Sequence, residues 1–295
     1  MGIIKINDKS IAKLIDVVSK GIGRLYKPRA IRKEADAEAY RIEVLAIAEA
    51  KKTLIEGDAR IELIQRTKER LLYQELNRQK NIEEIAEKSI KFLDKNVSDE
   101  PVDEDWRTRF FNKAQDITGE EMQEIWAKIL AGEVSRPGRI SLRTLDVVAN
   151  ISKEEAKIFQ RACSLSSGRG WIWKVGKKEA LGDFGLNYGD LLKLREAGLI
   201  HNGDNLVRII PVISQDPEII HIGDEIYSIH YLPKPDLKQY RIGQYAFTNA
   251  GSELCRLLDA KLNMRYFYDL MNFFKSEGYQ VHKIEPIHKD DNNQL

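Results

Sequence analysis

Residues 124–141 read EIWAKILAGEVSRPGRIS, and this tract sets the fold that we expect around it. Just upstream, Thr118 and Glu121 have the spacing of a helix capping box. Apolar side chains then recur at the spacing of one helix face, at Met122, Ile125, Trp126, Ile129 and Leu130. Gly132 fits the position after a helix end, and Pro137-Gly138 is a strong turn signal. The tract therefore predicts a helix ending at Gly132, a turn, and a second helix from Ser141.

Packing explains most residues of this tract. We interpret Trp126, Ile129, Leu130 and Gly132 as structural anchors of a small helical bundle. Glu133 is a poor catalytic candidate, because a carboxylate at a helix C-terminus is not stabilised by the helix dipole. A nearby arginine is its expected partner.

The tract also carries an arginine cluster formed by Arg136, Arg139 and Arg143. Residues 96–135 hold four basic and ten acidic residues, a net charge of −6. The arginines therefore either pair with this acidic region or contact a partner molecule, and the sequence leaves both open.

Upstream of the bundle, residues 28–98 contain one glycine, Gly57, and their Ala- and Glu-rich composition favours helix. We predict one very long helix that runs to about Lys95. Such a helix cannot bury its apolar face within a small domain, so it indicates self-association. The alternative is a helical hairpin that turns at residues 56–58.

Residues 1–27 predict a basic amphipathic helix. Its apolar side chains share one face, and Lys13, Lys20, Arg24 and Lys27 lie on another. Residues 1–29 carry seven basic and two acidic residues, a net charge of +5. Three interpretations stay open: packing on the chain itself, contact with an anionic membrane, or docking on a protein partner. The glycines Gly21 and Gly23 are expected to loosen its last turns.

The bulk composition bounds the class of protein. Charged residues make up 32% of the 295-residue chain and nearly cancel, to a net charge of +1. The two cysteines, Cys163 and Cys255, are too few for a disulfide framework, and we expect both to be buried packing residues. The sequence lacks a membrane-spanning apolar run and a secretory leader, so a cytoplasmic protein is expected, with membrane association left open.

Downstream, the pattern becomes mixed helix and strand. Short strands are predicted at residues 171–175, 206–210, 218–222, 225–232 and 239–247, with another after residue 278. We therefore expect an α+β protein: a helical N-terminal half, a bundle over residues 99–150, and an α+β domain over 151–289. Residues 290–295 are expected to be a disordered tail.

Within 151–289, the order helix, strand, helix (LLKLREAGLI, residues 191–200) and β-hairpin resembles winged-helix domains. The segment QYAFTNAGSEL (residues 244–254) resembles a strand-to-helix step common in them. In a DNA reader, the helix at 189–198 would enter the major groove. Its charges cancel, at Asp190, Lys193, Arg195 and Glu196, whereas phosphate binding needs a net positive surface. Nucleic acid is therefore the less favoured partner.

The tract also resembles an uncharacterised bacterial family, a domain of unknown function with the signature W-A-x-[IL]-L-A-G-E followed by S-x-[RK]-[ST]-L. Both halves are present, at residues 126–133 and 141–145. The tract also resembles a shorter version of this signature in the abortive-infection alpha family. The resemblance implies a setting in phage defence and no catalytic residues.

No motif with recognised chemistry was found. The five histidines lack metal-ligand spacing, although His221 and His230 are expected to be neighbours across a hairpin. We expect no metal and no cofactor. The favoured hypothesis is a non-enzymatic, self-assembling effector or sensor that binds a protein trigger through its C-terminal domain. A winged-helix DNA-binding regulator and an enzyme with an unrecognised site are the alternatives.

Overall fold

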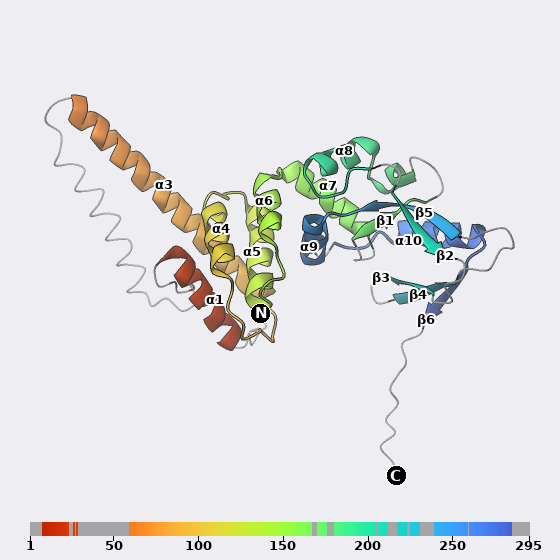
Figure 1. Cartoon of the computed structure of the whole chain (residues 1–295). Helices are drawn as coiled ribbons and strands as arrows, with labels where there is room; N and C mark the ends of the chain where they lie inside the picture. The colour runs from red at the N-terminus through yellow and green to blue at the C-terminus, as the bar shows by residue number, and fades with distance from the viewer. Residues whose placement is uncertain are drawn as a thin grey trace, which may run out of the picture. The chain divides into compact units, whose positions relative to one another are not determined.

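The computed structural model describes residues 8–23, 26, 28, 59–166, 170–175, 180–203, 206–211, 217–222, 225–230, 239–258 and 260–284 (Figure 1). The chain divides into an N-terminal unit, Met1–Leu145, and a C-terminal unit, Asp146–Leu295. Helices dominate the N-terminal unit, and small antiparallel sheets accompany helices in the C-terminal unit. The α+β class expected from the sequence is confirmed.

The N-terminal unit is a helical bundle built around the tract helix. Its elements are α1 (Asp8–Ile22), α3 (Ala59–Ser89), the 3-10 turn η2 (Ile90–Phe92), α4 (Glu104–Ala114) and α5 (Glu120–Ser135). Helix α5 contacts α3 and α1, while α1 also contacts α4. The unit boundary falls within α6 (Leu142–Asn150).

Helix α1 packs on the bundle through its apolar face. Leu14, Val17 and Val18 are buried, as the spacing of apolar residues predicts. Gly21 has a structural role that the sequence did not reveal. A Cβ atom there would lie 2.1 Å from Cδ2 of the Phe111 ring, so only glycine lets α1 approach α4 this closely.

The described part of the predicted long helix is α3, with 31 residues. The predicted turn at residues 56–58 lies outside the described residues. At its other end the helix stops at Ser89, not near Lys95. The chain extends at Leu93, and the following backbone is held by tertiary contacts, since Ser10 Oγ donates to Asp94 O at 3.0 Å.

The structure corrects both predicted ends of α5. The helix continues through Gly132 to Ser135, because the residues after the glycine are buried and held by tertiary contacts. Asp94 N donates to Ser135 Oγ at 3.1 Å, which fixes the last turn. At the other end Gly119 is the N-cap residue without a side-chain cap, so the Thr118 capping box is not formed.

The C-terminal unit contains two three-stranded antiparallel sheets with helices around them. Its strands are β1 (Trp171–Trp173), β2 (Val207–Pro211), β3 (Glu218–Ile222), β4 (Glu225–His230), β5 (Gln239–Ala246) and β6 (Gln280–Ile284). Its helical elements are α7 (Lys153–Ser164), η3 (Ala180–Phe184), α8 (Tyr188–Glu196), α9 (Asn249–Leu258) and α10 (Met264–Ser276). The strand orders are β1-β5-β2 and β3-β4-β6.

The sheet β1-β5-β2 and the helices α7 and α8 follow the order that the winged-helix resemblance implies. Strand β5 lies between β1 and β2 and pairs antiparallel with both, and the β3–β4 hairpin is inserted in the sequence between β2 and β5. The step from β5 into α9 is locked by Thr248. Its Oγ1 donates to Gly198 O at 2.6 Å and accepts from Gly251 N at 3.1 Å.

The second sheet changes one expectation about the histidines. His221 pairs with Ile226 in the β3–β4 register, so His221 and His230 are not cross-strand neighbours. His230 instead lies beside His282 of β6, with ring centroids 5.4 Å apart. The strand register pairs Ile222 with Glu225, which places His221 at one end of the β3–β4 pair and His230 at the other.

Candidate functional site

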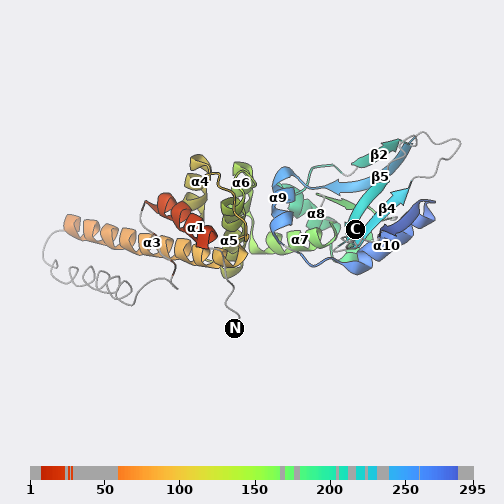
Figure 2. The same cartoon turned by 90° about the horizontal axis from the view of Figure 1, so that it is seen from below.

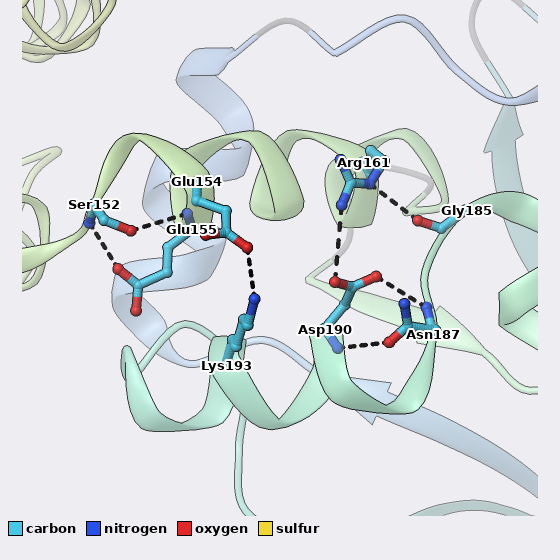
Figure 3. A network of polar contacts seen from close by, with 8 residues as sticks. All are labelled: Ser152, Glu154, Glu155, Arg161, Gly185, Asn187, Asp190 and Lys193. Carbon is cyan, nitrogen blue, oxygen red and sulfur yellow. Dashed lines mark hydrogen bonds and ion pairs between the residues drawn. The ribbon is translucent and has the colours of Figure 1, made fainter.

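Helices α7 and α8 form the best-defined polar site among the described residues (Figure 3). Each begins with a reciprocal capping box. Ser152 Oγ accepts from Glu155 N while Glu155 accepts from Ser152 N. Asn187 and Asp190 do the same for α8. The two capping boxes fix where the helices start.

Two ion pairs then connect α7 with α8, as Figure 3 shows. Lys193 Nζ donates to Glu154 Oε1 at 2.6 Å. At the other end, Arg161 Nη2 lies 3.8 Å from Asp190 Oδ1, and Arg161 Nε donates to Gly185 O at 3.0 Å. The acid that caps α8 is thus also the partner of a cation on α7.

The Lys193–Glu154 pair perturbs both of its groups. The hydrogen bond from Lys193 lowers the pKa of Glu154, and the same bond raises the pKa of Lys193. Both side chains remain exposed, so the pair orients α8 and adds little stability. In a DNA-binding protein α8 would offer Lys193 to phosphate, but here the Lys193 ammonium group is already paired with the Glu154 carboxylate.

The outward face of α8 is partly apolar. Leu191 and Leu194 are buried in the unit, whereas Tyr188 is 55% and Leu192 is 41% exposed. These two residues lie one helical turn apart on the same side, and Glu196 follows at the next turn. A face built of tyrosine, leucine and glutamate suits contact with protein better than contact with phosphate.

The structure buries all four anchors of the tract: Trp126, Ile129, Leu130 and Gly132. Glu133 is also buried, at 1% exposure. Its carboxylate accepts from Gly138 N at 2.6 Å and from Ile140 N at 3.0 Å. The carboxylate of Glu133 therefore has a backbone role, and an arginine partner for it stays a prediction. This side chain holds the turn that follows the helix.

The arginine cluster separates into distinct environments. Arg136 Nε lies 3.5 Å from Asp94 Oδ2, an internal contact with an acidic residue. Arg139 is half-buried and Arg143 is exposed. A partner contact for Arg139 and Arg143 stays a prediction.

The predicted basic face of α1 is partly used inside the N-terminal unit. Lys13 Nζ donates to Ser98 O at 2.7 Å, and burial lowers the pKa of Lys13. Lys20 pairs with Asp16 at 2.8 Å. Arg24 and Lys27 lie outside the described residues. Contact of these residues with a membrane or partner stays a prediction.

Cys163 and Cys255 are free thiols. Cys163 on α7 is buried and Cys255 on α9 half-buried, and these two helices contact each other. Burial raises the pKa of Cys163 well above its ordinary value.

Within the described ranges, no three His, Cys, Asp or Glu side chains gather to hold a metal ion. The same ranges contain no helix long and apolar enough to cross a membrane.

Sequence reasoning missed the α7–α8 ion pairs because they join residues about 30 to 40 positions apart, which only the fold brings together. The Asn187-x-x-Asp190 spacing was a local signal for the second cap. Comparison with curated proteins found no match, and neither did comparison with solved structures. The family described as "Protein of unknown function (DUF2806)" matches residues 65–271, which is more than half of the chain. The chain therefore belongs to the DUF2806 family.

Proposed function

We propose that this chain is a non-enzymatic, self-assembling interaction protein whose C-terminal unit binds a protein partner through the outer face of α8. One observation carries the proposal: Lys193 and Asp190 are held by α7, while Tyr188 and Leu192 face solvent. Exposed aromatic and aliphatic side chains on a fixed helix are typical anchors of protein interfaces.

The DNA-reading alternative rests on the winged-helix order of elements. It requires α8 to offer cations to phosphates. Lys193 would first have to leave Glu154, and the exposed Glu196 would face the DNA backbone. Electrostatics therefore favours a protein partner over duplex DNA.

The resemblance of the tract to the abortive-infection alpha family supports a setting in phage defence, with the C-terminal unit as the part that senses a trigger. Binding of α1 to an anionic membrane receives less support. Its apolar face packs on α4 and α5, and Lys13 is bound to Ser98. We therefore assign α1 to packing within the N-terminal unit.

A photo-crosslinking amino acid tests the α8 face directly. It replaces Tyr188 in one variant and Tyr268 in a control, since Tyr268 on α10 is also an exposed tyrosine, at 69% against 55% for Tyr188. In phage-challenged cells that express the chain, we expect a defined protein adduct from position 188 and none from position 268. Adducts to nucleic acid at 188, or equal protein labelling at both positions, would overturn the proposal.

Duplex binding supplies the complementary measurement. Fluorescence anisotropy at about 50 mM salt should show no binding of the wild-type chain, whereas a DNA reader would bind with a steep salt dependence. A Glu154→Gln variant frees Lys193 and serves as a sensitised control. Tight wild-type binding would make the DNA-reading alternative the better account.

A further inference from the structure

Two histidines lie together at one end of the sheet β3-β4-β6. His230 is the last residue of β4 and His282 lies in β6, and their ring centroids are 5.4 Å apart. His282 is exposed and His230 is half-buried. Strand pairing alone brings them together, so the spacing of the histidines along the chain does not predict the pair. The proposed function gives neither side chain a role.

The strand register puts both imidazoles on the same face of the sheet. His230 pairs with Gln280 and Ser228 pairs with His282, so the two histidines are diagonal neighbours on antiparallel strands. Successive side chains point to opposite faces, so Ile229 lies on the other face, where it is fully buried. Figures 1 and 2 show this sheet beside α10, which contacts β6. On the histidine face, His282 and Gln280 are exposed to solvent.

The spacing of the two rings suits two ligands of one metal ion. Imidazole nitrogens bind zinc at about 2.0–2.1 Å in tetrahedral geometry, which places the centroids of two such rings roughly 5 Å apart. The observed separation of 5.4 Å is close to this value. The ring planes are inclined at 76°, and the χ2 torsion of histidine has broad minima. One nitrogen of each ring can therefore turn toward a shared ion while both strands keep their places.

Strands β4 and β6 bring no positive charge to the histidine face. Lys283 follows His282, but it lies on the opposite face of β6 and pairs with Glu225. Besides the two histidines, the histidine face of these strands carries only serine, glutamine and isoleucine. No lysine or arginine of β4 or β6 therefore opposes a divalent cation between the two rings.

We propose that His230 and His282 together bind one divalent transition-metal ion of the zinc class through their imidazole nitrogens. Imidazole suits Zn²⁺, Cu²⁺ and Ni²⁺, whereas Mg²⁺ and Ca²⁺ prefer oxygen ligands. Two protein ligands leave the other coordination positions to water, so the ion is exchangeable, unlike the ion of a closed structural centre. The site lies apart from α8 and does not depend on the proposed partner binding.

Isothermal titration calorimetry of the full-length chain with Zn²⁺ alone tests the affinity. We expect saturable binding that His282→Ala weakens at least about tenfold, since loss of an outer-shell partner already costs about 10–100-fold. His201→Ala is the matched control, because His201 is also exposed and belongs to neither strand. This control should bind as the wild type does. A wild type without saturable binding, or equal affinities of the wild type and His282→Ala, overturns the proposal.

NMR of the wild-type imidazole groups gives a readout that does not depend on how a variant folds. The signals of His230 and His282 should shift together at the same Zn²⁺ concentration, because one ion binds both rings. An excess of Mg²⁺ should leave these shifts in place. A response from only one of the two rings, or displacement of Zn²⁺ by Mg²⁺, overturns the proposal. Far-UV circular dichroism confirms that His282→Ala keeps the wild-type fold in the calorimetric comparison.

Discussion

Replacement of Trp126 by alanine is the perturbation that bears most directly on the N-terminal core. The Trp126 side chain is fully buried. Its ring lies 5.2 Å from that of Phe110, which stacks on Trp106 at 5.0 Å. Truncating a buried aromatic side chain costs about 3–5 kcal/mol, and the lost ring contact accounts for about 0.5–1.5 kcal/mol of this. We expect a loss of about 4 kcal/mol in the free energy of unfolding.

The indole nitrogen provides a second, discriminating variant. Trp126 Nε1 is buried without a hydrogen-bond partner, and such a group costs about 1–3 kcal/mol. Trp126→Phe keeps one ring in the core and removes this unpaired donor. The two effects offset each other, so Trp126→Phe should cost less than about 2 kcal/mol.

Urea unfolding of the full chain, followed by far-UV circular dichroism, measures both variants. Tyr268→Ala on the exposed face of α10 serves as the control and should leave the transitions in place. An unchanged midpoint for Trp126→Ala would refute the buried-anchor reasoning. Equal losses for the alanine and phenylalanine variants would refute the role given to the ring.

Two further predictions concern local contacts. Gly21→Ala should release α1 from the bundle, because the new Cβ would overlap the Phe111 ring, whereas Gly119→Ala meets nothing within 4 Å. Hydrogen exchange over α1 should increase in the first variant and stay at the wild-type level in the second. Loss of Lys193 in a Lys193→Ala variant should raise the pKa of Glu154 toward its ordinary value, as read by NMR titration of the carboxyl group. Since the folded pKa is the lower one, the pair stabilises the fold above the ordinary Glu pKa and loses this effect as the pH falls through the folded pKa. A Glu154 titration that is identical in the two proteins would contradict this pairing.

Elements with strong local signals could be predicted from the sequence. Asp103 caps α4, with Trp106 N donating to its Oδ1 at 2.8 Å. Gly278 ends the last helix region with a φ of 84°. In both cases the residue is of a type that favours the backbone geometry at that position. The strands between residues 171 and 247 were likewise found from their β-branched and aromatic composition.

Features that depend on tertiary contacts could not be predicted. Gly132 resembles a helix stop, but burial of the next turn carries α5 past it. Gly21 resembles a weak point in α1, although it is required by the Phe111 ring. The role of Glu133 depends on a turn that folds back onto its carboxylate. Local propensity gives no information on such contacts, because the fold alone brings their partners together.

The candidate site was predictable only in outline. The cancelling charges of residues 189–198 already argued against a phosphate-binding helix. The reason for this lies in α7, where Glu154 and Arg161 engage Lys193 and Asp190. The pairing joins separate helices, so it required the structure.

The mass of the intact wild-type chain in solution tests the central claim of self-assembly most directly. Sedimentation equilibrium over a wide concentration range should give a mass that rises above that of one 33.9 kDa chain toward at least twice that value. A constant mass of one chain at every concentration and salt condition would contradict the account.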